Sequence, residues 1–430
     1  MGAAIQVGAP PRAMHVAAVT AGNALEFYDF LTYAFFAAQI GRTFFPSADA
    51  STSLLASLAT FGAGFLMRPV GALVIGRIGD RAGRKPAMLL TFMLMGAAMI
   101  GLALTPSYRM IGVAAPVIAV LFRLVQGFAL GGEVGPNTAY LVEAAPPHRR
   151  GLYVSFQFMS QDAAVLVAGL IGFVLASNLS DAQLDAWGWR AAFLAGAAIV
   201  PFGLVLRRQL AETLPQHAEA ASRQPAMTPG LWRIAVLGFV MLASGTVVSY
   251  LETYLTTYAT ATLHMATRIG FLATITVGLV SMIFDPIGGW LSDRFGRRPL
   301  MIAPRVLLLL VTVPGFWWVS TDRTAEALIG LVAAMSVGHA TVTAAVLAAT
   351  AESMPARIRA GSTGLTYALA ISVFGGSTQF LVAWLTKATS SPLAPAWYMT
   401  AAAVCGPIAM TLMPETAPAK TGRGLHDGRS

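Results

Sequence analysis

Charged residues are scarce in this chain: only 11% of its 430 residues are Asp, Glu, Lys or Arg, whereas 56% are hydrophobic. A soluble globule of this size needs more charged surface, so the composition indicates an integral membrane protein. Cysteine is nearly absent as well. The single Cys405 excludes an intramolecular disulfide and a cysteine metal cluster. We expect neither a metal nor a cofactor.

Acidic residues are the rarer of the two charges, with 19 Asp and Glu against 28 Lys and Arg and a net charge of +9. Such a surplus is typical of nucleic-acid binding when it forms a basic face or tail. Here the basic residues lie in short loops between apolar runs, which is a topology signal. We therefore expect contact with membrane lipid and no nucleic-acid partner.

Twelve apolar segments are long enough to cross about 30 Å of hydrocarbon at 1.5 Å per residue. Their approximate limits are 15–40, 54–78, 87–106, 111–142, 151–177, 189–208, 231–259, 268–291, 300–320, 325–352, 361–387 and 395–413. The first contains Asn23, Glu26 and Asp29, which the apolar core of a cleavable signal peptide would not carry, so we interpret it as a retained helix. The sequence predicts an all-α integral membrane protein.

Two loops repeat each other 213 positions apart (289 − 76). Gly76 to Met88 reads GRIGDRAGRKPAM, and Gly289 to Met301 reads GWLSDRFGRRPLM. A second pair, EAAPPHRRG before span five and ESMPARIRAG before span eleven, has a period near 210. The chain is therefore predicted to be two copies of a six-span unit. A substrate site between such copies, near the bilayer midplane, is the plan of a secondary transporter.

Basic residues divide unequally between the two faces, with 17 on the face of the repeated loops and six on the other. By the positive-inside rule, the face with more basic residues and both chain termini are expected in the cytoplasm. The spans are expected to cross the inner membrane. The predicted organisation is a tail (1–14), a first bundle (15–208), an interdomain loop (209–230), a second bundle (231–413) and a tail (414–430).

The pairing of GxxxDRxGRK after span two with GxxxDRxGRR after span eight resembles the major facilitator superfamily. Three more stretches resemble its metabolite/proton symporter family: GNALEFYDF from Gly22, RPVG from Arg68, and RLVQG from Arg123 running on to GGE at Glu133. The resemblance implies two six-helix bundles around a central cavity and proton-coupled import by alternating access, without enzymatic activity.

Within that family, WGWR before span six, LRR and ET after it, and Gln157 with Gln161 in span five are most similar to the citrate and tricarballylate symporters. This branch implies import of a small organic anion, a di- or tricarboxylate such as citrate or tricarballylate, together with protons. We expect the transporter to be a monomer.

Arginines inside the spans are the candidate anion ligands. A charge near the bilayer centre costs about 3 kcal/mol or more, so it needs a partner, a cavity or a function. Arg68 and Arg123 both fall near mid-membrane, and a guanidinium group can bind a carboxylate in two places. The alternative is structural, with each Arg paired to an acid on a neighbouring helix, such as Glu26 or Asp29. The two interpretations are compatible if the acids balance the arginines in the empty site.

Uncharged polar side chains and one histidine are expected to shape the same site by hydrogen-bonding substrate oxygens. They are Asn23, Gln126, Gln157, Gln161, Tyr254 and His339. Tyr250, Tyr254 and Tyr258 share one face of span seven and either line the cavity or gate it. His339 either ligates substrate, relays protons or is only hydrogen-bonded.

The proton-carrier candidates are Glu133, Glu26 and Asp29, with Glu133 preferred. A carboxyl group in low dielectric beside a substrate anion holds its proton more tightly. Asp162 in span five would repel a polycarboxylate if ionised, so we expect it to be protonated, paired or turned away. Glu252 in span seven is either a second proton site or a sign of a positively charged substrate.

Asp285 and Arg305 are predicted to form a structural ion pair, so that neither side chain is available to bind substrate. Each lies eight residues, about 12 Å, into the membrane from the second repeated loop. The loops themselves are expected to latch the halves in one conformational state. The latch residues are Asp80, Arg84, Asp293 and Arg297.

Two alternative functions stay open. The transporter could carry a zwitterionic osmolyte or an amine, of the betaine or proline type, cradled by Glu252, Asp162 and the tyrosines. A transport-inactive sensor or a membrane enzyme is the other class. The sequence shows no paired nucleophile and base, no metal-ligand cluster and no soluble output domain, which favours transport.

Overall fold

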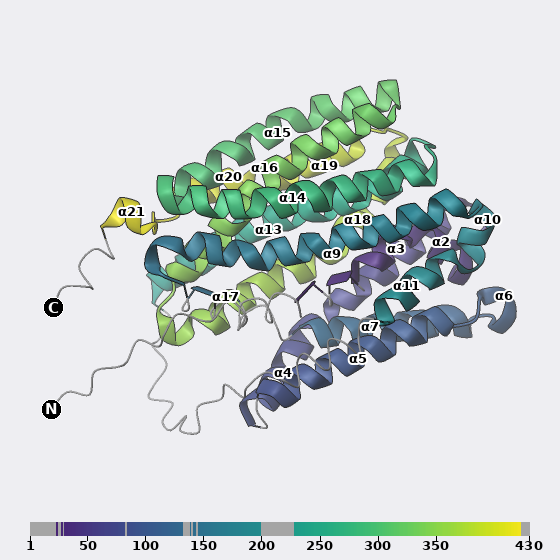
Figure 1. Cartoon of the computed structure of the whole chain (residues 1–430), viewed down its shortest axis with the longest axis horizontal. Helices are drawn as coiled ribbons and strands as arrows, with labels where there is room; N and C mark the ends of the chain where they lie inside the picture. Colours follow the sequence, from purple (N-terminus) through teal and green to yellow (C-terminus); the bar gives the residue numbers. More distant parts are fainter. Residues whose placement is uncertain are drawn as a thin grey trace.

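The computed structural model describes residues 23–24, 27–28, 30–81, 84–131, 138, 141–142, 145–198 and 228–422. In this part of the chain every regular element is a helix, and the long helices run side by side in one bundle (Figure 1). Seven of them are long and apolar enough to cross a membrane. They cover Ala50–Ile75, Pro147–Asn178, Pro229–Thr262, Thr267–Phe295, Arg297–Asp322, Ala325–Glu352 and Gly361–Thr389.

The first half supplies the helices before residue 199. These are α2 (Ala37–Phe44), α3 (Ala50–Leu66), α4 (Arg68–Arg81), α5 (Arg84–Leu104), α6 (Tyr108–Ile111), α7 (Ala114–Leu130), α9 (Arg150–Asn178), α10 (Asp181–Gln183) and α11 (Trp189–Ala197). α9 crosses the middle of the bundle in the view of Figure 1, with α14, α15 and α16 above it and α5 and α7 below it.

The second half begins at Pro229. Its helices are α13 (Pro229–Thr257), η3 (Tyr258–Thr262), α14 (Thr267–Phe295), α15 (Arg297–Asp322), α16 (Ala325–Glu352), α17 (Ala356–Ala370), η4 (Ile371–Gly375), α18 (Gly376–Thr389), α19 (Ala394–Ala403), α20 (Cys405–Leu412) and α21 (Pro418–Thr421). α16 matches its predicted span, and it is the most enclosed of the seven long helices.

Local signals fix where these helices begin and turn. Thr228 accepts from the N–H of Leu231 and precedes Pro229, so α13 starts with an N-cap and a first-turn proline. Thr324 caps α16 in the same way through the N–H of Ala327. Gly296 has φ +107°, a conformation that favours glycine, and it turns the chain from α14 into α15.

The predicted spans compare well with these helices. The seven long helices and the shorter apolar helices Leu89–Leu104 and Ala114–Leu130 each overlap one of nine of the twelve spans, with ends that differ by a few residues in most cases. The predicted spans 15–40 and 189–208 lie partly outside the described residues. The twelfth is divided into α19 and α20, close to Pro407, which has no backbone N–H to continue the helix. The interdomain loop (209–230) is described only from residue 228.

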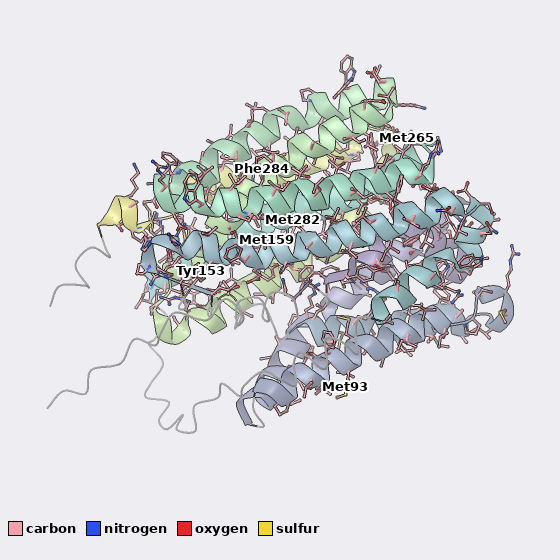
Figure 2. The ribbon with its side chains drawn as sticks, viewed as in Figure 1. Met93, Tyr153, Met159, Met265, Met282 and Phe284 are labelled. Carbon is pink, nitrogen blue, oxygen red and sulfur yellow. The ribbon has the colours of Figure 1, made fainter. Side chains whose placement is uncertain are left out.

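The two halves meet most closely where α9 packs along α14, a contact here named the seam. Gly278 of α14 approaches the backbone of α9 so closely that a Cβ atom there would lie 2.4 Å from the Leu166 nitrogen. Figure 2 labels Met159 on α9 and Met282 on α14 along this seam. The seam therefore sets the spacing of any side chains that α9 and α14 turn toward each other.

Candidate substrate site between the two halves

A cavity of about 100 Å³ lies between the halves. This volume is enough for several waters or for part of a small molecule. Its polar lining includes Gln161 and Asp162 from α9, Tyr250 and Glu252 from α13, Asp285 from α14, Arg305 from α15, His339 from α16 and Tyr367 from α17. Three carboxyl groups, one guanidinium group and one imidazole thus converge on a small space.

Arg305 is the arginine of this cavity, and only 1% of it is exposed. Its Nε and Nη1 atoms have no hydrogen-bond acceptor among the described residues. Glu252 is the acid that acts on Arg305 electrostatically, but the two do not form a direct ion pair. Buried N–H groups are nearly always paired, so these nitrogens mark a place for an acceptor that the described protein groups do not supply.

The predicted ion pair between Asp285 and Arg305 is wrong. Asp285 and Arg305 line the same cavity, but α14 turns Asp285 toward α9, where its carboxyl group contacts that of Asp162. No ion pair joins Asp285 to a basic residue in the described part of the chain. The prediction failed because it did not account for which face of α14 carries Asp285.

The other polar groups surround these charges. His339 lies within electrostatic reach of Arg305, and its Nδ1 atom has no partner among the described residues. Tyr367 of α17 lies close to Gln161 of α9, and Tyr250 of α13 lies close to Arg68 of α4. Of the predicted substrate ligands, Gln161 and His339 line this cavity. Tyr367 was not predicted, because a tyrosine in an apolar helix looks the same in the sequence whether or not it faces a cavity.

Arg68 and Arg123 lie together in the first half, outside the lining of the cavity. Arg68 packs 4.4 Å from the ring centre of Phe65, and Arg123 packs 4.5 Å from that of Phe30. Arg123 also donates from Nη1 to Gln126 at 2.6 Å. Cation–π contacts of this kind hold a buried guanidinium group in place. Substrate binding by Arg68, Arg123 and Gln126 stays a prediction.

Asn23 and Gln157 belong to a hydrogen-bond network inside the first half. Asn23 donates from Nδ2 to the carbonyl oxygen of Gln157 at 3.1 Å and to Ser160 Oγ at 3.0 Å. Gln157 accepts from Thr138 through Oε1 at 3.0 Å. These contacts tie the first span to α9, and neither residue lines the central cavity.

The predicted proton carriers Glu26, Asp29 and Glu133 lie outside the described residues, so their roles stay predictions. Asp80 is the second-to-last residue of α4 and Arg84 is the first residue of α5, but the side chains of both are outside the described part.

The second repeated loop forms a charged network where α14 turns into α15, here named the motif end. Asp293 accepts backbone N–H groups from Gly151 at 2.8 Å and Leu152 at 2.9 Å, both in the first half. Arg297 pairs with Asp293 at 2.8 Å and with Glu352 at 3.0 Å. Asp293 therefore joins the second half to the first residues of α9, as a latch would require.

Glu415 closes the same network. It accepts the backbone N–H groups of Arg297 at 2.8 Å and Arg298 at 3.0 Å, at the N-terminus of α15. Partial burial raises the pKa of the Glu415 carboxyl group, but backbone donors from Ala417, Arg297, Arg298 and Thr416 outweigh that effect and leave its pKa below the ordinary value.

The halves also touch at the far side of the membrane bundle, here named the opposite end. Lys387 of α18 donates to the carboxylate of Asp49, which precedes α3, and to Thr52 at 3.2 Å. This contact and the hydrogen bonds from Thr52 and the Ser51 N–H hold the pKa of Asp49 below its ordinary value. The aromatic rings of Phe36 and Phe271 meet nearby with centres 5.0 Å apart.

A second cavity, of about 540 Å³, opens at this opposite end. Its lining includes Arg42, His264, Arg323 and Lys387. Tyr254, predicted to bind substrate, lines this outer cavity and not the central one.

Comparison with known proteins places this geometry in a family. The model of the Major Facilitator Superfamily matches residues 19–378. The chain is 37% identical to the citrate-proton symporter of Klebsiella pneumoniae, over 91% of this chain and 89% of that protein. It is 37% identical to the alpha-ketoglutarate permease of Escherichia coli over 90% of each chain, and 32% identical to the proline/betaine transporter of the same organism over 94% and 83%.

The crystal structure of a D-xylose-proton symporter has the same fold, with a TM-score of 0.77 at 18% identity over 94% of this chain and 98% of that one. The all-α membrane fold predicted from the apolar spans and the family resemblance is confirmed. Because the family model covers most of the chain and relatives above 30% identity cover nearly all of it, the protein belongs to the major facilitator superfamily and is a multi-pass membrane transporter, not an enzyme.

Proposed function

We propose that this protein is a proton-coupled symporter that imports a small di- or tricarboxylate by alternating access. The observation that supports it most directly is Arg305, a buried guanidinium group that lines the central cavity with two nitrogens lacking an acceptor among the described residues. A small polycarboxylate fits this demand, because Nε and Nη1 lie on different edges of the guanidinium group and separate carboxylate oxygens can accept from each of them.

The relatives support the same chemical class. Two of them, at 37% identity, carry the names citrate-proton symporter and alpha-ketoglutarate permease, and both named substrates bear two or more carboxylates. At this identity the exact acid is open. Gln161, His339 and Tyr367 lie around Arg305 in the cavity and would hydrogen-bond the remaining oxygens of such an acid.

The charge of the cavity supports coupling to protons. Asp162, Glu252 and Asp285 would carry −3 if fully ionised, and Arg305 offsets only one of those charges, which leaves −2. A cavity at −2 repels a polyanion, especially where water is excluded. Substrate therefore enters favourably only if protons neutralise part of this charge, which is the behaviour of a symporter.

The remaining assignments follow the sequence predictions. We propose that the motif end faces the cytoplasm together with both chain termini, and that the two six-span bundles are 15–208 and 231–413. Asp293 and Arg297, with their counterparts Asp80 and Arg84, would latch the halves at that face.

A zwitterionic osmolyte is the second candidate substrate. The proline/betaine transporter of Escherichia coli is 32% identical to this chain, and Glu252 lines the cavity with its Oε1 atom free of donors among the described residues. A quaternary ammonium or iminium group could lie between Glu252 and Tyr250 while its carboxylate met Arg305.

Uptake into proteoliposomes separates the two. We expect labelled citrate or alpha-ketoglutarate to accumulate only when the lumen is alkaline, and labelled betaine not to accumulate. Arg305→Gln should weaken the apparent affinity for the acid by ~100-fold, because two charge-assisted hydrogen bonds are worth about 3 kcal/mol together. Arg305→Lys keeps the charge but not the planar guanidinium group, so its apparent affinity for the acid should lie between those of wild type and Arg305→Gln.

Arg268→Gln is the matched control, since Arg268 is exposed at the first turn of α14 and lies outside both cavities. Accumulation of betaine alone, or accumulation of the acid without any dependence on the proton gradient, would contradict the proposal.

A further inference from the structure

We infer that Asp162 and Asp285 form the proton-coupling site and share one proton across the seam between the two halves. The inference deepens the proposed symport and depends on it. Asp162 belongs to α9 of the first half and Asp285 to α14 of the second, and both line the central cavity. Their carboxyl groups contact each other, which makes them a direct polar link between the halves at the level of the substrate site.

This contact requires a proton. Two ionised carboxylates have only acceptor oxygens, so a hydrogen bond between them forms only when one of the two is protonated. Asp285 is 1% exposed, and its Oδ2 atom has no donor among the described residues. With no donor for this atom among the described residues, the contact of Asp285 with Asp162 is favourable only when the pair holds a proton.

The surrounding charges leave the pair without a cation of its own. The titratable and charged groups that face it from the packed helices are Tyr250 and Glu252 of α13, Arg305 of α15, His339 of α16 and Tyr367 of α17. Arg305 acts on Glu252, whereas Glu252 adds negative charge beside both aspartates. Arg305 and Glu252 therefore balance each other, and a shared proton is what remains to reduce the charge of the aspartate pair from −2 to −1.

The backbone holds the two carboxyl groups together as long as the halves are packed here. A Cβ atom on Gly278 would lie 2.8 Å from the carbonyl oxygen of Asp162 and 2.4 Å from the Leu166 nitrogen. Since α9 and α14 touch at main-chain distance, the pair separates only when one half moves against the other.

Protonation and the motion of the halves are thus linked. When the cavity opens to one side of the membrane, a proton from water binds to the separated carboxylates, and the shared hydrogen bond favours closing of the seam around the substrate. When the cavity opens to the other side, the substrate and the proton leave to water. The empty carrier then returns with both carboxylates ionised and hydrated, so the proton brought in with the substrate is not carried back.

Asp162→Asn and Asp285→Asn test this coupling separately from substrate binding. In either variant an amide N–H takes the place of the shared proton, so the seam closes without one. We expect both variants to retain citrate counterflow, which needs no net proton movement, with an apparent affinity that differs from that of wild type because each substitution alters the lining of the cavity. Accumulation of citrate against a gradient under an inside-alkaline pH difference should fall to a ratio near one. Asp322→Asn, at an exposed acid of α15, should leave both unchanged.

Infrared spectroscopy of the purified protein supplies a readout that needs no substrate. The wild type should show a protonated carboxyl C=O band that disappears at high pH, and each Asn variant should lack that band. Asp285→Glu keeps a carboxyl group, so this variant should accumulate citrate under the gradient where Asp285→Asn does not, with a shifted pH dependence. Its activity would show that a substitution at this position does not by itself prevent folding.

The outcomes separate the two proposals. If wild-type protein moves neither citrate nor alpha-ketoglutarate, the proposed function fails, while the infrared band still decides whether the aspartates share a proton. If both Asn variants accumulate citrate as the wild type does, or if their infrared spectra keep the protonated band, the inference is overturned and the proton is carried elsewhere.

Discussion

Two buried arginines of the second half differ in what surrounds their guanidinium groups. Arg297 is fully enclosed, and it pairs with Asp293 and Glu352 while donating to Ser292 at 2.6 Å. Arg305 is equally buried, but its Nε and Nη1 atoms lack acceptors in the described part of the chain. A satisfied buried arginine stabilises the fold, whereas an unsatisfied one in a cavity is suited to bind.

The sequence could not make this distinction. Arg68, Arg123 and Arg305 all stand in apolar runs, and each is an equally good anion ligand by composition. Which of them faces the cavity depends on the rotation of each helix about its axis and on its neighbours. That rotation is set by contacts between distant segments, which one sequence does not reveal.

Glu415 allows a prediction on pH at the scale of one residue. Its pKa is lower in the folded protein than its ordinary value of 4.5, so its stabilising effect is complete above that value and is lost as the pH falls through the folded pKa. Glu415→Gln should therefore lower the melting temperature at pH 7, and the difference from wild type should shrink on acidification below pH 4.5.

Melting curves of both proteins across this range provide the measurement, because every other titrating group is common to the two. A difference that stayed constant down to the acid limit would show that Glu415 acts through packing and not through its charge.

At the scale of helices, glycine sets how closely α3 and α7 approach. A Cβ atom on Gly127 would lie 1.6 Å from the carbonyl oxygen of Gly64, and main-chain atoms cannot move aside as a side chain can. Gly127→Ala should destabilise the protein by about 1–3 kcal/mol, as overpacking of a core does. The measurement is the denaturant or thermal midpoint in detergent.

Gly361→Ala is the matched control. Gly361 lies in α17 with nothing within 4 Å of the position of an added Cβ atom and without a positive φ. Since alanine has a higher helix propensity than glycine, this change should be neutral or stabilising by up to about 1 kcal/mol. Equal effects of the two substitutions would contradict the packing argument.

The helices themselves were largely predictable. Apolar length gave the long spans, and the observed starts of α13 and α16 lie within two residues of the predicted ones. Two kinds of feature were not predictable. The break between α19 and α20 depends on one proline in an otherwise apolar run, and the contact of Asp285 with Asp162 depends on which face of α14 packs against α9.

At the scale of the whole molecule, polar contacts join the halves at both ends of the bundle. Asp293 accepts from the start of α9 at the motif end, and Lys387 pairs with Asp49 at the opposite end. Alternating access requires each of these contacts to break in turn while the other is kept.

A disulfide at the opposite end should stop this cycle. We predict that Asp49→Cys with Lys387→Cys, in a Cys405→Ser background, will reduce uptake more than tenfold after oxidation and recover on reduction. Each single substitution, treated in the same way, controls for the loss of the ion pair. If cross-linked protein still transported at the uncross-linked rate, the opposite end would not open during transport.

The unpaired groups of the central cavity also bear on how this carrier survives outside its membrane. Buried polar atoms without a partner, such as those of Arg305 among the described residues, subtract from stability. A ligand that pairs with Arg305, as we propose for the substrate, would add RT ln(1 + [L]/Kd) to the free energy of unfolding, about 2.7 kcal/mol at a hundredfold excess over Kd. The identity of this ligand can be sought among small acids by the rise in melting temperature that each one gives, before any transport is measured.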